Sequence, residues 1–268
     1  MSVNKEVVDR IRSTFLSMAS DSPADDYHPK DMDRIRQKDW PIERFVLTTK
    51  SEDQALAGLV KAMKWRKSYG VNDFRDDQFP EEMYRMAEYS QFGRDREGRR
   101  ILWTQMSHHH RCADWNQLLK QFIVYQYELL DRDQDREGGW AVVGDPTGAG
   151  LGNVEMDFNN FTVDVLQSYY PKGPKYMLVV DLPWVLTATA KLIMAFMNEH
   201  LRQTVKFIKR DELDAYVSPE YIPVHMKGGQ YDKPLVQIPE GVRPLDKHEQ
   251  FTADQIKKIY STYKSELK

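Results

Sequence analysis

The first third of the chain carries apolar residues at every third or fourth position, between charged ones, and this spacing predicts amphipathic helices. The clearest helix covers residues 51–70, where Ser51 and Gln54 form a capping box and Gly70 supplies the stop. Similar patterns predict helices over 7–18, 30–39 and 79–90. A helical module is therefore expected at the start of the chain.

The pattern changes after about residue 99 to short, continuous apolar runs that alternate with helical segments. Such runs suit strands that are covered on both faces, and their alternation with helices predicts crossover units and a mainly parallel sheet. The expected strands are "RRILWTQM", "GWAVVGDPTG", "KYMLVVDLP" and the weaker "TVKFIKR". The intervening helices are expected over 114–131 and 157–170. The predicted fold class is α/β.

One segment, residues 181–208, contains an unbroken apolar run from Leu192 to Met197. At 100° per residue this run covers the whole circumference of a helix, whereas a surface helix normally has one apolar stripe. The uniformly apolar part would rise only about 9 Å, and a bilayer span needs roughly 20 apolar residues. We therefore expect a soluble protein in which this helix has two apolar neighbours, neither of them a spanned bilayer.

Composition narrows the possible classes of protein. The 268 residues are 41% hydrophobic and 29% charged, as in globular proteins. A net charge of -3 does not indicate a nucleic-acid-binding protein. The only cysteine, Cys112, excludes an internal disulfide and a cysteine zinc site, and it is expected to be a free thiol in a reducing, cytoplasmic setting. The N-terminal residues show no secretory signal.

Three motifs suggest site chemistry. His108, His109 and His110 could indicate a metal site. Neighbouring residues on a strand face opposite sides, however, and no acidic residue follows at the spacing of metal ligands. We therefore favour a solvated loop and expect no metal or cofactor. "GDPTGAGLG" lacks the P-loop lysine and the dinucleotide-binding spacing, which favours a turn. Asp145 is a catalytic carboxylate or a turn cap, and the cap is favoured. An enzyme with its site at Asp145 is an alternative that rests on fold class alone.

Four cations, Arg202, Lys206, Lys209 and Arg210, follow the apolar helix directly. They form either a solvated face or a contact for an anionic phosphate. The second interpretation gains weight because apolar residues and cations adjoin here, as the two ends of a phospholipid require.

Several ordered segments resemble the CRAL-TRIO lipid-binding family, of the kind typified by the yeast phosphatidylinositol transfer protein. They are "RFVLTTKSEDQALAGLVKAMKWRKSYGVNDF", "FGRDREGRRILW", "YYPKGPKYMLVVDLPWVLTATAKLIMAFMNEHLRQTVKFI" and "SPEYIPVHMKGG", within residues 31–232. The resemblance implies a mainly parallel sheet that floors a deep apolar pocket, closed by a mobile gate helix. It also implies an N-terminal helical module over 1–90, a CRAL-TRIO domain over 91–233, and a Pro-rich connector with a C-terminal helix over 234–268.

The resemblance assigns site residues. The gate would carry Leu192, Ile193, Phe196 and Met197, and Trp184 would anchor its hinge side or simply pack in the core. The pocket floor would come from Val142, Leu178, Val180 or their strand neighbours.

The headgroup residues would be Lys172, Arg202 and Lys206. Members that bind phosphatidylinositol have an acidic residue where Lys172 stands, so the expectation is a differently held or anionic headgroup.

The expected function is therefore binding of a hydrophobic small molecule, a phospholipid or another lipid, and its carriage between membranes without enzymatic activity. The expected partners are the bound lipid and, transiently, a membrane surface, with a protein partner possible through the N-terminal helices or the C-terminal tail. The expected localisation is cytoplasmic and peripheral to membranes. A lipid-sensing adaptor that does not transport its ligand is the alternative from a different class.

Overall fold

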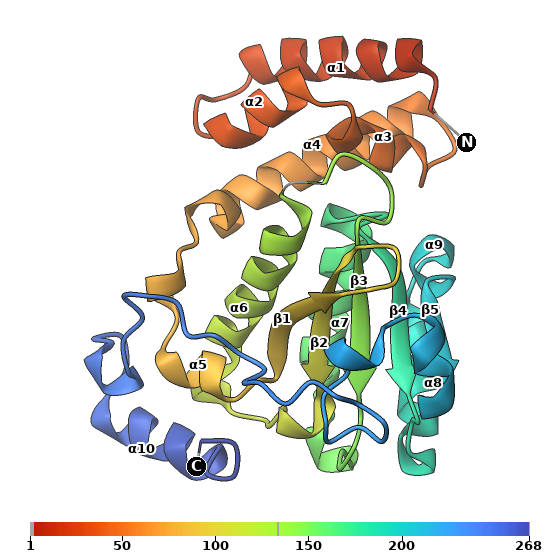
Figure 1. The fold of residues 1–268 in the computed structure, drawn as a ribbon. Helices are drawn as coiled ribbons and strands as arrows, with labels where there is room; N and C mark the ends of the chain where they lie inside the picture. Colours follow the sequence, from red (N-terminus) through yellow and green to blue (C-terminus); the bar gives the residue numbers. More distant parts are fainter. Residues whose placement is uncertain (1–2, 133, 268) are drawn as a thin grey trace.

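The computed structural model describes residues 3–132 and 134–267, and its N-terminal part is a module of packed helices (Figure 1). The Ser51 side chain accepts the backbone N–H of Gln54, and Gly70 ends the longest helix of this module at a positive φ of 77°, as the sequence predicts. A further short helix, at Trp40, was not predicted. The helices of the module are α1 (Lys5–Ser20), α2 (Pro29–Gln37), α3 (Trp40–Val46) and α4 (Glu52–Tyr69).

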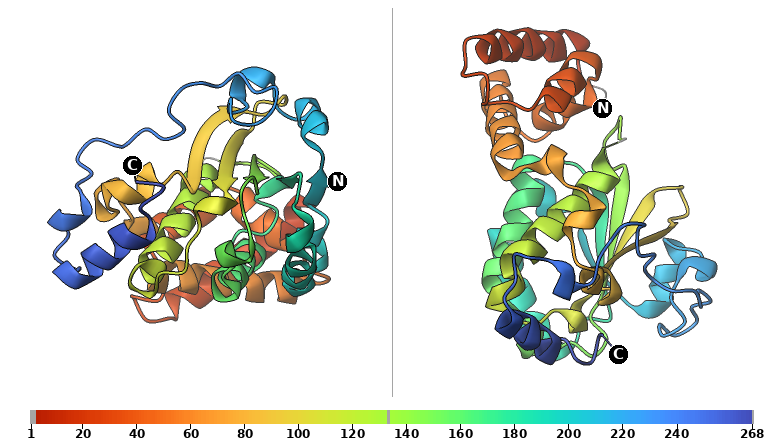
Figure 2. Two further views of the ribbon diagram at one scale, coloured as in Figure 1. Left: turned by 90° about the horizontal axis from the view of Figure 1, so that it is seen from below. Right: turned by 90° about the vertical axis from the view of Figure 1, so that its left-hand side faces the viewer.

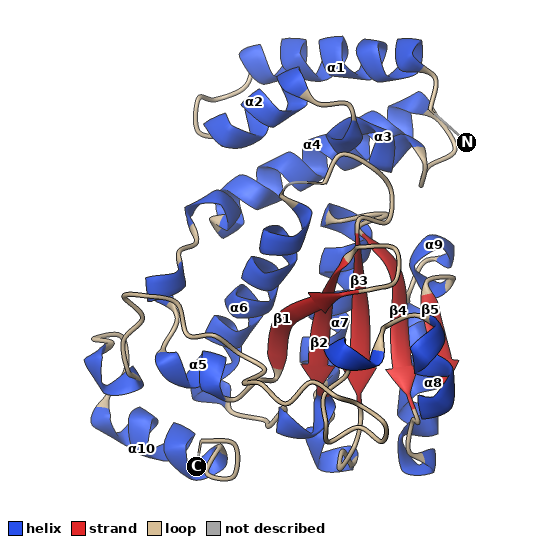
Figure 3. Ribbon diagram, in the orientation of Figure 1, coloured by secondary structure: helices blue, strands red, loops and turns tan. Residues whose placement is uncertain are grey.

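A five-stranded sheet forms the centre of the molecule, and its strands lie in the order in which they follow along the chain (Figure 3). The first pair is antiparallel and every other neighbouring pair is parallel. This confirms the predicted α/β class and mainly parallel sheet. The strands are β1 (Tyr89–Arg94), β2 (Arg100–Gln105), β3 (Trp140–Asp145), β4 (Pro174–Val180) and β5 (Val205–Ile208).

Strand β1 corrects the sequence analysis, which predicted a helix over residues 79–90. The helix found there is α5 (Glu81–Arg85), and Ala87 adopts a positive φ of 52°, which no helix continues. Tyr89 then pairs with Thr104 of β2. Long-range pairing overrides local helical spacing here, and the domain boundary predicted at residue 90 falls inside this strand.

The two faces of the sheet are covered differently, as the turned views show (Figure 2). Helices α6 (Ala113–Asp131) and α7 (Met156–Asp164) lie over one face, where they share an apolar cluster with Leu102 and Val142. The other face, which includes Trp103 and Val143, packs against Leu213, Val217, Ile222 and Met226 from the segment after β5. The sheet is thus buried on both sides, as its continuous apolar strands indicate.

Buried ion pairs join the N-terminal module to the sheet domain. The guanidinium of Arg66 donates to Asp31 at 2.9 Å and to Glu128 of α6 at 2.8 Å, and all three side chains are buried. Arg44 donates to Asp131 at 2.7 Å. Arginine and carboxylate groups can be buried at this interface because each charge has a hydrogen-bonded counter-charge.

The apolar segment of residues 181–208 is not one helix. It forms a 3-10 turn, η6 (Trp184–Leu186), followed by α8 (Thr187–Phe196), α9 (Glu199–Arg202) and β5. Among the helices of the described residues, none is both long enough and apolar enough to cross a bilayer.

The C-terminal segment packs against the sheet domain. Helix α10 (Ala253–Thr262) is the predicted C-terminal helix. It begins at a capping box of Thr252 and Gln255, and its Ile259 and the following Tyr263 are fully buried. The remaining short turns are η1 (Val71–Asp73), η2 (Asp76–Gln78), η3 (Met106–His108), η4 (Leu151–Asn153), the π turn η5 (Val165–Tyr169), η7 (Arg210–Ala215), η8 (Pro219–Tyr221) and η9 (Leu245–Lys247).

Candidate functional site

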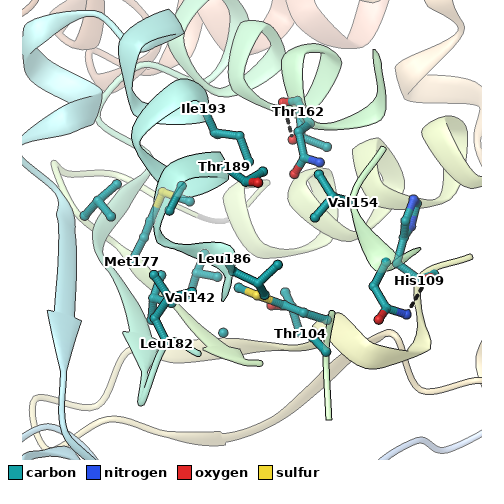
Figure 4. Close-up of a pocket in the computed structure, with 18 of the residues that line it drawn as sticks. Thr104, His109, Val142, Val154, Thr162, Met177, Leu182, Leu186, Thr189 and Ile193 are labelled. Atoms are coloured by element: carbon teal, nitrogen blue, oxygen red, sulfur yellow. Dashed lines mark hydrogen bonds between the residues drawn. The ribbon is translucent and has the colours of Figure 1, made fainter. Parts of the chain in front are cut away.

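A cavity of about 240 Å³ lies between the sheet, α7 and α8 (Figure 4). This volume is just below the range of pockets that enclose drug-sized ligands. Most of the lining is apolar: β3 contributes Val142, β4 contributes Met177 and Val179, and α7 contributes Phe158 and Val163. Such a surface favours a ligand that is itself largely apolar.

Helix α8 covers this cavity with one of its two apolar faces. Ile193 and Met194 line the cavity, and Met197 just after the helix does so too. Leu192 and Phe196 point away and are 59% and 54% exposed. The structure therefore brings Ile193 and Met197 of the predicted gate residues to the cavity, and leaves Leu192 and Phe196 on the outer surface.

Trp184 lies in the turn before α8 and is 87% exposed. The alternative of ordinary core packing is therefore wrong for this residue. Its neighbour Leu186 is buried and lines the cavity instead. A large aromatic side chain is thus exposed to water in the turn that leads into α8.

The predicted floor is partly corrected. Val142 lines the cavity, and Leu178 borders it although its side chain belongs to the cluster on the other face of the sheet. Val180 belongs to that other cluster and is not part of the cavity lining. Because side chains alternate along a strand, Met177 and Val179 occupy the positions that face the ligand space.

The lining also has a polar part, which sequence analysis missed. Glu88, from the loop before β1, accepts at 2.9 Å from Nδ1 of His109, and both residues are buried and line the cavity. The imidazole packs against Phe158 with ring centroids 4.9 Å apart. Its Nε2 lies 3.3 Å from a carboxylate oxygen of Glu155. The sequence signal was the triple histidine, but the acidic partners lie 21 and 46 residues away in the chain.

The surroundings of His109 shift its protonation. Burial alone would lower the pKa of its imidazole, but the hydrogen bond with Glu88 and the charges of Glu88 and Glu155 outweigh burial and raise the pKa above the usual 6.5. A larger share of this ring is therefore protonated at a given pH than in a free histidine.

This shift predicts a pH-dependent contribution to stability. A pKa that is higher in the folded state means that the contribution is complete below about pH 6.5 and is lost as pH rises through the folded-state value. We expect the unfolding free energy of the wild type to exceed that of His109→Gln by on the order of 1 kcal/mol at pH 6, and by less at higher pH. Urea unfolding of both proteins at pH 6 and at higher pH measures this difference in free energy. A difference that grows with pH would contradict the assignment.

The three histidines do not form a solvated loop, and that expectation is wrong. His108 bonds the carbonyl oxygen of Met86 at 2.6 Å, and His110 bonds Glu266 of the C-terminal segment at 3.0 Å. Each ring thus faces a different partner. Among the described residues, no group of three or more His, Cys, Asp or Glu side chains is placed to hold a metal ion.

Asp145 caps its turn, as predicted. One carboxylate oxygen accepts the N–H of Thr147 at 3.0 Å, and the other bonds Nε2 of His225 at 2.7 Å. Burial raises its pKa, but the bonds from His225 and Thr147 outweigh burial and lower it. Asp145 lies outside the cavity lining, although Ala149 and Gly150 of the same turn contribute to it. Cys112 is a free, buried thiol, and burial raises its pKa.

The three predicted headgroup cations do not gather at the cavity. Lys172 pairs with Glu137 at 3.1 Å, and Arg202 pairs with Glu199 at 2.8 Å. Lys206 lies over the ring of Tyr216, 5.2 Å from its centroid, because alternation along β5 turns Val205 and Phe207 toward the cavity and Lys206 to the opposite face. Their role with a headgroup stays a prediction.

Together, these features define an α/β protein in which the sheet and helix α8 bound a partly open, largely apolar cavity. The family model for the CRAL/TRIO domain matches residues 85–228, more than half of the chain. The chain belongs to the CRAL/TRIO family, whose members bind lipophilic ligands and transfer them. The predicted family is thereby confirmed.

Relatives of known name agree with this assignment. The chain is 24% identical over 202 residues to CRAL-TRIO domain-containing protein C365.01 of Schizosaccharomyces pombe, covering 71% of this chain and 55% of the relative. It is 25% identical over 228 residues to the Sec14 cytosolic factor of the same yeast, covering 76% and 72%. The chain thus spans about half the length of the first relative.

A solved structure shows the same fold. The crystal structure of Sfh5 superposes with a TM-score of 0.66 over 97% of this chain and 100% of the other, at 15% sequence identity. At that identity the likeness concerns the fold alone. It includes the helical lead-in, since nearly the whole chain is covered.

Proposed function

We propose that this protein binds a lipid in the cavity under α8 and carries it between membranes, with α8 as the gate. The observation that carries the proposal is a helix with two apolar faces, one of which covers an apolar cavity. The apolar part of a phospholipid or of another lipid would contact Met177, Val179 and Ile193 and keep water away from these side chains. Each buried methylene contributes about 0.8 kcal/mol, so several suffice for tight retention.

The outer face of α8 explains where the gate opens. Trp184, Leu192 and Phe196 are more than half exposed, and each is an apolar side chain that would gain contacts on entering a membrane interface. Moving the helix at that interface exchanges its cavity contacts for lipid contacts, so the barrier to opening falls there and not in water.

The predicted headgroup cations lie outside the cavity lining. Lys206 and Arg202 are exposed, and we propose that they contact anionic headgroups at the membrane together with Lys172. We propose accordingly a cytoplasmic protein that meets membranes peripherally and transiently.

Lipid transfer between donor and acceptor vesicles tests the proposal. We expect the wild type to accelerate transfer and Phe196→Asp to slow it about tenfold or more, because a carboxylate resists insertion into the interface, while ligand binding in solution persists. Met18→Asp is the matched control, since Met18 is 44% exposed on α1, and it should transfer like the wild type. Binding without transfer by the wild type would instead support a lipid sensor.

Within the family, we propose a particular likeness to the lipid-binding part of motile sperm domain-containing protein 2. Its support is the four segments "MDF", "YYPK", "DLPW" and "YVSPEYIPVHM". The tethering role of that protein depends on its other parts and is not extended to this chain.

A further inference from the structure

The far end of α8 is bonded to the turn that follows α7. Helix α8 ends at Phe196, and Met197 has an extended backbone before α9 begins after its N-cap residue, Asn198. The side-chain oxygen of Gln167, in the π turn η5, accepts the backbone N–H of Asn198 at 2.8 Å. A side chain from outside the gate thus holds the break between α8 and α9.

The next residues of the same turn pack against the N-terminal module. The ring of Tyr169 stacks on that of Trp65 in α4, with centroids 3.8 Å apart and an angle of 2° between the planes. The hydroxyl of Tyr170 accepts an N–H from Arg66, also in α4, at 3.2 Å. Helix α4 therefore supports the turn from which Gln167 reaches the gate. Turns of the π type are frequent at functional sites.

We propose that Gln167 is a positioning residue for the gate. It holds the far end of α8 in the closed position, from a turn that the N-terminal module keeps in place. The inference rests on the proposed carrier function and adds a restraint on opening. It also gives the N-terminal module a part in ligand exchange.

The place of this hydrogen bond gives it leverage on opening. The motion of a gate is absorbed by a few residues at the ends of elements, and here these are Met197 and Asn198. Met197 lines the cavity, so a movement of α8 away from the cavity changes the backbone at this point and separates the Asn198 N–H from Gln167. The closed form alone then has the bond. One net hydrogen bond changes such an equilibrium about two- to tenfold.

Hydrogen–deuterium exchange of the purified full chain tests the inference directly. Gln167→Ala removes the acceptor, so the amides of residues 187–198 should exchange about two- to tenfold faster than in the wild type. Gln167→Glu keeps an accepting oxygen at the same reach and should exchange like the wild type. Gln203→Ala is the matched control, because the Gln203 side chain bonds Glu199 at 2.6 Å and not the end of α8. A merely structural role would speed exchange throughout the sheet domain instead.

Transfer between vesicles gives a second measurement. Donor vesicles of phosphatidylcholine carry either pyrene-labelled phosphatidylcholine or the fluorescent sterol dehydroergosterol. Gln167→Ala should raise the transfer rate by about the factor seen in exchange, because the closed form loses its restraint. Trp65→Ala should act in the same direction, since it removes the stack under the turn, and Trp65→Phe, which keeps a stacking ring, should restore the wild-type rate.

The outcomes separate the two proposals. Exchange and transfer at the wild-type rates in Gln167→Ala overturn the positioning role while the carrier function stands. An effect of Gln167→Ala without one of Trp65→Ala overturns the part given to the N-terminal module. If the wild type transfers neither probe, the carrier function loses its support, and the exchange rates over α8 still decide the role of Gln167.

Discussion

Ile193→Asp is expected to abolish lipid binding. Ile193 lies on the face of α8 that lines the cavity, so the new carboxylate would face an apolar ligand without a counter-charge. An unpaired buried charge costs several kcal/mol, which corresponds to at least a hundredfold loss of affinity. Titration of the purified variant with a lipid that the wild type binds would measure the loss.

Leu192→Asp is the matched control for this experiment. Leu192 is the preceding residue in the same helix and is 59% exposed, so the same substitution places its carboxylate in water. Its affinity for lipid in solution should stay within a fewfold of the wild type. Equal losses in both variants, with helix content unchanged by circular dichroism, would show that α8 does not cover the binding site.

Asp131→Ala is expected to destabilise the fold by about 3–5 kcal/mol. The Asp131 carboxylate is fully buried and accepts two hydrogen bonds from Arg44, at 2.7 and 2.9 Å. Removing this carboxylate leaves a buried guanidinium without its counter-charge. Breaking a buried ion pair in this way costs about 3–5 kcal/mol in other proteins. Thermal unfolding should show a midpoint lower by about 10 °C.

Asp33→Ala is the comparison for Asp131→Ala. Asp33 pairs with Arg36 at 2.9 Å, but both side chains are more than half exposed, so the cost should be below about 1 kcal/mol. Equal costs for the two substitutions would contradict the assignment of the buried pair.

The buried pair of Asp131 and Arg44 also predicts that the free energy of unfolding decreases at low pH. Burial would raise the pKa of Asp131, but Arg44 and Arg34 outweigh burial and hold it well below its usual value. Its contribution is therefore complete above about pH 4 and is lost as pH falls.

The sequence determined the main elements because their signals are local. Helix α4 follows from the Ser51 cap and the Gly70 stop, and β3 and β4 follow from continuous apolar runs between turn residues. The unusual segment around Leu192 likewise showed that a helix needed apolar neighbours on two sides, since its composition alone covers the whole circumference.

Only the tertiary structure decided the site. Local spacing could not show that Tyr89 pairs with β2, that Val180 faces away from the cavity while Val179 faces it, or that Lys206 points to the opposite side of the sheet. The phase of alternation along a continuously apolar strand is set by what packs on each face, and the sequence of that strand does not contain it.

The polar pair in the cavity shows the same division. Glu88 and His109 are 21 residues apart, on a loop before β1 and on a loop after β2, and antiparallel pairing of those strands brings them within 2.9 Å. By itself, the sequence determined that this is an α/β protein with a helix that needs apolar neighbours on two sides. The packing of distant segments decided which side chains meet inside the cavity, because contact across the fold depends on register and not on spacing along the chain.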